Sequence, residues 1–291
     1  MATVRLGITH LFLATALLGL IAATARPVDQ PAQAESSQGP KTPLDPPTPG
    51  VSGDEVFRAL LQHNDLRNAE LKQYSAIRTY EVKNTGGKLY ARQVVQLDYH
   101  APDTKMFMTT LEEGSGLVRH MVFKRLIESE TDTAAGKEHH DSSITPANYS
   151  FELLGEEQAG PYYCFVIQAT PKRQDKYLFE GTIWIDAQDF AIVKIAGHPA
   201  KRPSFWIERA DFVRQYQRIG RFWLPLKDET VVHLRLNGIK ILTIDHGEYV
   251  VNVGTPDRQE VQSSHDAAEQ FSDVSPTDVR HPRESDQEGY R

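Results

Sequence analysis

The stretch GTIWIDAQDFAIVKI, Gly181–Ile195, decides how the rest of the chain is interpreted. Two runs rich in β-branched and aromatic residues flank a short polar break, which is typical of a β-hairpin. Asp186 and Asp189 flank the tight turn, where carboxylates commonly accept hydrogen bonds from their own backbone. We therefore interpret the two carboxylates as shaping the turn rather than as a pair for acid–base chemistry.

Alternating apolar and polar residues on both sides of this hairpin predict more strands. The turn signals NTGG, between the first two strands, and the Asn-Gly pair in LRLNGIKIL favour two further hairpins. The expected strands are Tyr74–Val82, Lys88–Tyr99, Met106–Leu111, Tyr149–Leu154, Tyr162–Ala169, Tyr177–Asp186, Phe190–Gly197, Ser204–Gln217, Arg221–Leu236 and Ile239–Val251.

Two helices interrupt this pattern. Ser52 and Glu55 have the spacing of a capping box and begin apolar residues at helical spacing that continue to about Gln73. GLVRHMVFKRLIESE predicts a second helix, Leu117–Ile127, with a broad apolar face. Helix, strands, one helix and many strands together predict an α+β fold, a long antiparallel sheet with helices on one face.

The N-terminus has the features of a secretory signal peptide, residues 1–25. Arg5 is followed by a nearly continuous apolar run. Ala23-Thr24-Ala25 then offers a cleavage pattern, and cleavage after Ala25 would make Arg26 the first residue of the mature chain. The alternative is an uncleaved anchor. The apolar run is shorter than the ~20 residues that a spanning helix needs, so cleavage is favoured.

Both flanks of the folded part have compositions that favour disorder. Residues 26–53 are rich in proline, and residues 254–291 are acidic and nearly free of large apolar side chains. Such segments bury too little apolar surface to offset the entropy of ordering. We therefore expect a proline-rich linker, one domain at 54–253, and a disordered acidic tail.

Few residue patterns indicate chemistry. The net charge of −7, without a long basic cluster, argues against nucleic acid binding. The single Cys164 lies in an alternating strand and is interpreted as a core residue. His139-His140-Asp141 is the nearest approach to a metal cluster, but neighbouring loop residues rarely hold an ion without a distant ligand. We predict no metal, no cofactor and no catalysis; a hydrolase using scattered His and Asp is the less favoured alternative.

Apolar and aromatic side chains are abundant, with several strands apolar on both faces. The simplest interpretation of each such residue is a place in the core. A curved sheet covered by a helix can also leave an apolar hollow that holds a lipid. The candidate lining residues are Val95, Leu97, Phe107, Leu117, Val118, Met121, Val122, Leu126, Phe179, Ile183, Trp184, Ile185, Trp206 and Trp223.

The opening stretch, extended as GTIWIDAQDFAIVKIAG, resembles the Trp-x-Asp-x-x-x-hydrophobic hairpin of the LolA/LolB-type outer-membrane lipoprotein-sorting proteins and of the related periplasmic regulator RseB. YSAIRTYEV, LDYHAPDTKMFM and FWLPLKDET resemble strands of the same superfamily. The resemblance covers roughly Asp54 to Val253. Arg78 and Arg92 are both candidates for the functional strand arginine of the carriers.

This resemblance implies an unclosed β-barrel, with helices covering the concave face of a long curved antiparallel sheet and an apolar cavity between them. In LolA-like carriers the cavity holds the acyl chains of a lipoprotein. The chain is thus expected to be a periplasmic or secreted, non-catalytic carrier for lipoprotein acyl chains or another apolar ligand. The alternative is an RseB-like regulatory module that senses lipid or a membrane-protein partner.

Overall fold

A computed structural model of the chain describes residues 44–134 and 142–253. The chain divides into two units at residue 252, and the first unit holds the helices and strands described below. The predicted signal peptide with its Ala25–Arg26 junction, most of the proline-rich linker, the acidic tail and the His139–Asp141 cluster lie outside the described residues.

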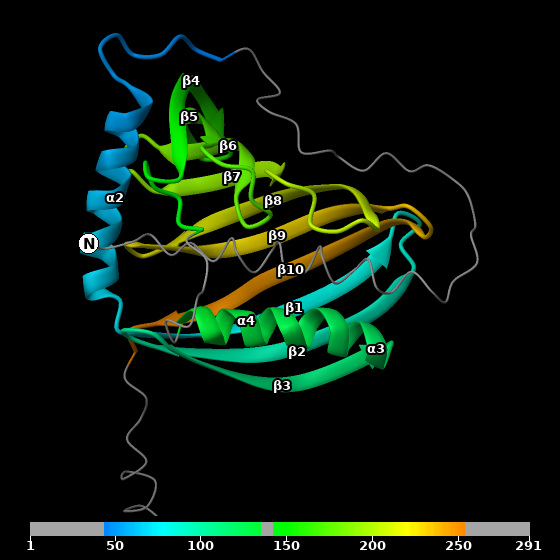
Figure 1. Ribbon diagram of the computed structural model, residues 1–291. Helices are drawn as coiled ribbons and strands as arrows, with labels where there is room; N and C mark the ends of the chain where they lie inside the picture. The colour runs from blue at the N-terminus through cyan, green and yellow to red at the C-terminus, as the bar shows by residue number, and fades with distance from the viewer. Residues whose placement is uncertain (1–43, 135–141, 254–291) are drawn as a thin grey trace, which may run out of the picture. The chain divides into compact units, whose positions relative to one another are not determined.

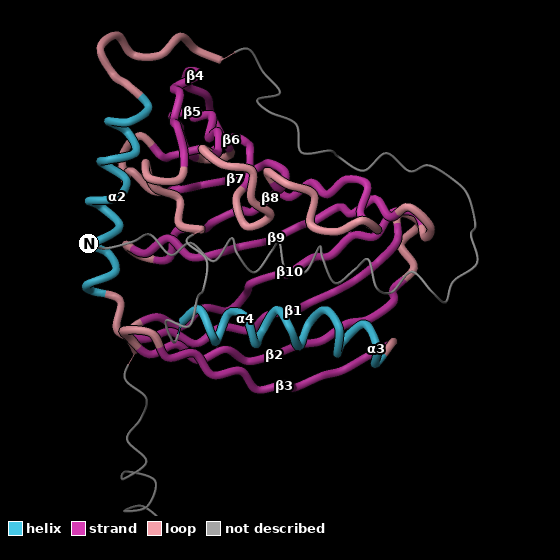
Figure 2. Tube along the Cα trace, viewed as in Figure 1, coloured by secondary structure: helices cyan, strands magenta, loops and turns pink. Residues whose placement is uncertain are grey.

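The first unit is one open antiparallel sheet of ten strands with helices packed on it (Figure 1). In Figure 2 the helices, in cyan, contrast with the magenta strands. The helical elements are α2 (Gly53–Glu70), α3 (Gly116–Val118), the π-helix η2 (Arg119–Lys124) and α4 (Arg125–Ala134). The strands are β1 (Gln73–Asn84), β2 (Leu89–His100), β3 (Thr104–Gly114), β4 (Tyr149–Ala159), β5 (Tyr162–Pro171), β6 (Phe179–Asp186), β7 (Ile192–Pro199), β8 (Ile207–Ile219), β9 (Phe222–Leu234) and β10 (Gly238–Val251).

The sheet order is β3-β2-β1-β10-β9-β8-β7-β6-β5-β4. Each strand except β1 and β10 pairs only with its neighbours in sequence. The sheet does not close, because β3 and β4 are its outer strands. The expected α+β class and the long unclosed antiparallel sheet with helices on it are thereby confirmed.

One row of directly opposed residues shows that both helical regions cover the same face of the sheet. From β2 to β5 the row runs through Gln93, Tyr80, Ile244, Asp228, Arg214, Ile195, Ile183 and Ile167. Tyr80 and Ile244 pack beneath η2 and α4, whereas Ile183 and Ile195 belong to the cluster that includes α2. Side chains alternate between the faces of a strand, so this row defines the inner face.

Helix α2 is fixed at both ends. Its start carries the predicted capping box: the Glu55 amide donates to Ser52 Oγ, and the Ser52 amide donates to Glu55 Oε2. Phe57 and Leu60 are fully buried, and the Phe57 ring stacks on Phe151 of β4 at 3.9 Å. Near the other end, the Arg67 guanidinium donates to the backbone carbonyl oxygens of Asp189 and Phe190.

The β6–β7 hairpin therefore anchors a helix. Asp186 Oδ2 accepts from the Asp189 amide at 2.7 Å, as expected for a turn-shaping carboxylate. Asp189 Oδ2 in turn accepts from Trp223 Nε1. The turn presents its carbonyl groups to Arg67, so the polar break of the opening stretch has a structural role.

Residues ahead of α2 take part in the fold. Asp45 forms an isolated bridge with Glu156 of β4, and the Thr48 amide and hydroxyl donate to the Glu156 carboxylate. Leu44 packs on the outer-face cluster that contains Trp184. The sequence pattern places these residues in the proline-rich linker that is expected to be disordered; in the structure, Leu44, Asp45 and Thr48 contact the sheet.

Candidate functional site

The α3–η2–α4 segment, residues 116–134, is the principal candidate for a functional element because it lies on the inner face without being tied into the sheet by backbone pairing. Ser115 caps its start, and its hydroxyl accepts from the Val118 amide. Gly114, at φ +75, provides the left-handed turn that leads from β3 into the helix. A Cβ at Gly114 would meet the Tyr90 carbonyl oxygen at 2.4 Å, so glycine is required there.

The middle of the segment is a π-helix, residues 119–124. π-helical turns are rare in proteins overall, and those that occur are often found at functional sites. Val118, Val122 and Leu126 form the predicted apolar stripe and are 1%, 0% and 2% exposed. Phe123 is also fully buried, and its ring lies 5.7 Å from that of Tyr80. The sequence pattern missed Phe123 because a regular helix would turn it away from this stripe.

An ionic latch joins the helical segment to the strands. Arg78 of β1 is 4% exposed and donates from both terminal nitrogens to Glu130 of α4, at 2.7 and 3.2 Å. Lys105 of the edge strand β3 donates to the same carboxylate at 2.5 Å. Burial opposes the charge on Arg78, but Glu130 outweighs it and holds the pKa of the guanidinium well above its usual range. We call Arg78, Lys105 and Glu130 the ionic latch.

A second ionic group, the Asp228 triad, lies on the inner face of β8, β9 and β10. Arg214 donates to Asp228 from Nε and from Nη2, the latter at 3.0 Å, and His246 Nε2 lies 3.1 Å from Asp228 Oδ2. Their side chains are at most 8% exposed. Because Arg78 lies directly opposite His246 in the β1–β10 register, the latch and the triad adjoin.

Burial and charge pull the pKa values of this triad in different directions. Burial alone would raise the pKa of Asp228, but Arg214 and His246 outweigh it and lower it to about 2. Burial, followed by the charge of Arg78, lowers the pKa of His246. The triad is therefore an Arg214–Asp228 ion pair beside a histidine that resists protonation.

Four buried polar atoms on the inner face have no hydrogen-bond partner among the described residues: Arg78 Nε, Tyr216 Oη, Thr230 Oγ1 and His246 Nδ1. Buried polar groups are normally satisfied, so each such atom calls for a bound partner or a conformational change. The inner face thus combines an apolar helix–sheet contact with a polar strip that is not fully satisfied.

The predicted lining residues fall into two sets. Ten lie on or pack against the inner face: Val95, Leu97 and Phe107 on β2 and β3, Val118, Met121, Val122 and Leu126 on the 116–134 segment, and Phe179, Ile183 and Ile185 on the α2 side. The structure separates three of the other four from them: Trp184 is buried in an outer-face cluster with Cys164, and Leu117 and Trp206 are 54% and 43% exposed. Trp223 is part-buried, donates to Asp189 and packs against both the α2-side cluster and the outer-face cluster.

The two candidates for the functional strand arginine, Arg78 and Arg92, lie in different environments. Arg78 points to the inner face and forms the latch, whereas Arg92 is a half-buried side chain whose Nε lies 3.4 Å from Glu81. The other ionic residues were missed, but a signal was present. Arg78 interrupts the buried series Ala76, Tyr80, Val82, and His246 continues the buried series Leu242, Ile244. A charge at the apolar phase of a strand indicates a buried partner.

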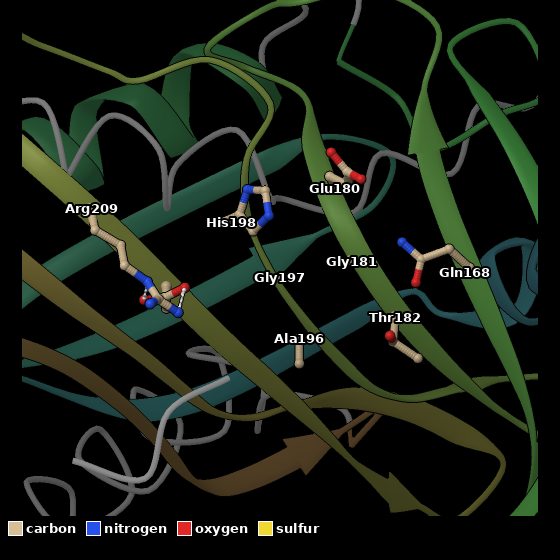
Figure 3. A pocket seen from close by; sticks show the side chains of 9 residues that line it. Gln168, Glu180, Gly181, Thr182, Ala196, Gly197, His198 and Arg209 are labelled. Carbon is tan, nitrogen blue, oxygen red and sulfur yellow. Dashed lines mark hydrogen bonds and ion pairs between the residues drawn. The ribbon is translucent and has the colours of Figure 1, made fainter. Parts of the chain in front are cut away.

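The outer face carries two open hollows. One, of about 180 Å³, is lined by Glu180 and Thr182 of β6, His198 of β7 and Asp211 of β8. Figure 3 shows Glu180 and His198 on neighbouring strands above the backbone of Gly181 and Gly197. At one side of the hollow, Arg209 donates a hydrogen bond to Asp211. The other hollow, of about 360 Å³, lies over β1, β10 and β9. Most of the residues that line them are polar, unlike those of the apolar site predicted from the sequence.

Within residues 44–134 and 142–253, no group of three or more His, Cys, Asp or Glu side chains is arranged to hold a metal ion. In the same ranges, none of the helices has both the length and the apolar character to cross a bilayer.

No family model and no curated protein matches the chain. Solved structures do. A DUF1329 family protein from Desulfovibrio piger matches with 13% identity and a TM-score of 0.39, over 74% of this chain and 99% of that one. A putative outer membrane lipoprotein-sorting protein domain from Vibrio parahaemolyticus matches with 12% identity and a TM-score of 0.35, over 72% and 98%. A LolA superfamily protein from Nitrosomonas europaea matches with 10% identity and a TM-score of 0.34, over 72% and 97%.

Proposed function

We propose that this protein is a non-catalytic, carrier-like binding protein that holds an apolar chain, such as the acyl chains of a lipoprotein, between the 116–134 segment and the inner face of the sheet. The observation that carries the proposal is the way this segment is attached. It is held by an apolar stripe, by the ionic latch and by Arg119, whose guanidinium contacts Glu112 and the Gly114 carbonyl oxygen. A ligand can therefore replace the stripe while these polar contacts set the closed position.

The physical argument rests on what the segment covers. Val122 and Phe123 contact an inner face made of Tyr80, Val95 and Ile244. An acyl chain offers the same apolar surface as these helix side chains, so exchanging one for the other costs little hydrophobic free energy. The latch then decides between the closed and the ligand-bound arrangement.

The buried nucleophile candidates support binding rather than hydrolysis. Burial, followed by the charges of Asp186 and Glu157, raises the pKa of the Cys164 thiol to about 12, so the thiolate needed for attack is scarce. A hydrolase built on the His246–Asp228 pair would need a hydroxyl or thiol at His246 Nδ1. That atom is buried and has no hydrogen-bond partner among the described residues.

A matched pair of overpacking variants tests the proposal. Leu60 and Val122 are both fully buried, on α2 and η2 respectively. Leu60→Trp should cost roughly 1–3 kcal/mol of unfolding free energy, as overpacking does in a filled core. Val122→Trp should cost clearly less, because the segment can move outward, and should reduce the binding of a fluorescent fatty acid.

Denaturant unfolding and fluorescence titration measure the two quantities. If Val122→Trp destabilises the protein as much as Leu60→Trp, and the parent binds no fatty-acid probe at micromolar concentration, the segment packs on a solid core and the carrier function is wrong.

Export is part of the proposed function, because the sequence has a signal-peptide pattern at residues 1–25. We expect the periplasmic or secreted protein to begin at Arg26. N-terminal sequencing of the exported protein checks this, and a chain that still begins at Met1 would contradict it.

A further inference from the structure

The largest exposed aromatic side chains of the described residues lie together at one end of the sheet. Phe205 and Trp206, in the β7–β8 connection, are 69% and 43% exposed, and Leu236, in the β9–β10 hairpin, is 68% exposed. Figure 1 shows this hairpin projecting where the yellow and orange strands meet. Lys201, Arg202 and Arg235 beside them are also exposed. We call these six residues the aromatic tip.

The structure holds the aromatic tip outward. Arg235 donates from Nε to the Phe205 carbonyl oxygen at 2.8 Å and from its backbone amide to the Trp206 carbonyl oxygen at 3.1 Å. The Arg235 guanidinium also lies 4.8 Å from the centre of the Phe205 ring. Phe205 and Trp206 meet edge to face at 5.4 Å. Two connections far apart in sequence are thus joined so that the rings face solvent.

Exposure of this kind is unfavourable without a partner, because each ring presents a large apolar area to water. The nearest core residue in sequence, Ile207, is fully buried, so the strand itself is well packed and the exposure is confined to the tip. The charge identifies the partner. Three basic residues flank the rings, and the nearest acidic residue in sequence is Glu208, the second residue of β8.

We propose that the aromatic tip docks the protein on an anionic lipid surface. Tryptophan and phenylalanine favour the headgroup region, where an aromatic ring can be half-buried, and lysine and arginine are attracted to anionic headgroups. The tip adjoins the helix–sheet contact of the proposed carrier site, because Ile207 and Leu234, next to Trp206 and Arg235, belong to the cluster that packs against the 116–134 segment. The tip residues themselves point to solvent rather than into that contact. Docking would bring the protein to a membrane without occupying that site.

The test uses the protein expressed from Met1 and purified as the host delivers it. Vesicles of phosphatidylcholine alone are compared with vesicles that also contain phosphatidylglycerol, by co-sedimentation and tryptophan emission. Trp184 is buried and Trp223 part-buried, so a blue shift on vesicle addition reports chiefly on Trp206. We expect binding and a blue shift with the anionic vesicles, both weakened by salt.

The double variant Phe205→Ser, Trp206→Ser should lose vesicle binding about tenfold. Its matched control is Met106→Ser, Met108→Ser, two side chains of edge strand β3 that are 53% and 57% exposed. The control should bind as the parent does. Because both pairs are exposed, unchanged unfolding midpoints will show that neither variant has lost its fold.

A charge variant, Lys201→Gln with Arg202→Gln, should weaken binding to the anionic vesicles about fivefold for each residue, and leave binding to phosphatidylcholine unchanged. The proposal is overturned if the parent does not bind anionic vesicles, if it binds both vesicle types equally, or if the Met106–Met108 control loses as much binding as the aromatic variant. None of these outcomes bears on fatty-acid binding, which is measured without vesicles.

Discussion

The two helical regions cover the same face of one sheet but are attached differently. Helix α2 inserts Phe57 and Leu60 into an aromatic and aliphatic cluster, and its far end is fixed by Arg67 to two backbone carbonyls. The 116–134 segment also buries an apolar stripe, but polar contacts join it to the strands: the ionic latch at Glu130 and the contacts of Arg119 with Glu112 and the Gly114 carbonyl oxygen. Helix α2 is thus held mainly by packing. The 116–134 segment is held closed by ionic contacts, and water can solvate these charges when the segment opens.

A pair of phenylalanine truncations, Phe57→Ala and Phe123→Ala, tests most directly whether the two helical regions are attached differently, since both rings are fully buried. Phe57→Ala should lower the unfolding free energy by about 3–5 kcal/mol, because it empties a site that cannot collapse. Phe123→Ala should lower it less and should mainly speed amide exchange in residues 116–134.

Chemical denaturation and hydrogen exchange give both values. Equal losses of global stability for the two variants would mean that both halves form one cooperative core, and that the 116–134 segment does not open separately.

The latch is tested by Glu130→Gln, with Lys124→Gln as its control on the same helical segment. Removing one partner of a buried pair leaves Arg78 charged and uncompensated, which costs about 3–5 kcal/mol if the helix stays closed. We expect the segment to open and admit water instead, so that its amides exchange faster and the global loss is smaller. Lys124 and Glu128 are each 56% exposed, and breaking that pair should cost roughly 0–1 kcal/mol. Unchanged exchange in Glu130→Gln would contradict the latch.

Acidification should lower the stability of the fold through the Asp228 triad, which lies on the inner face between the two helical regions. The pKa of Asp228 is about 2 in the folded protein and near its ordinary value of 3.8 when unfolded. The unfolded state therefore binds the proton more readily, and stability falls as the pH drops from about 4 to about 2, by about 2 kcal/mol. His246, whose pKa is also lowered, contributes a loss in the same direction that begins near pH 6.5.

Unfolding midpoints measured between pH 7 and pH 2 check this, with Asp228→Asn as the comparison. That variant should start less stable and lose less between pH 4 and pH 2. A parallel decline for both proteins would show that other carboxyl groups govern the acid transition.

Local signals in the sequence predicted much of the fold. The capping box at Ser52 and Glu55 started α2, and the glycine of the Asn-Gly turn, Gly238, has the positive φ of 64 that such a turn requires. The open sheet came instead from the order of the elements and from the resemblance. A strand's alternation gives its buried face but not its partner, and so the place of β1 beside β10 could not be read from the pattern.

The partners within the ionic part of the candidate site could not be predicted from the sequence for the same reason. Arg78 and Glu130 are 52 positions apart, and Arg214 and Asp228 are 14 apart. A single charged residue on a strand usually indicates a solvent-exposed position, and only tertiary pairing makes it a buried one. Likewise Trp184 is a large apolar residue of the kind that lines ligand cavities, but its position in the alternation of β6 places its side chain on the outer face.

The pairing of β1 with β10 has a consequence for how the chain reaches this structure. β1 to β3 form one set of sequential neighbours and β4 to β10 another, and Tyr74 lies opposite Val251 where the two sets meet. Each set can form from short-range contacts, whereas this seam must close a loop of most of the domain at a large entropic cost. We therefore expect the seam to form late in folding. It runs beside Arg78 and His246, so the two ionic groups of the inner face are completed only when the whole sheet has assembled.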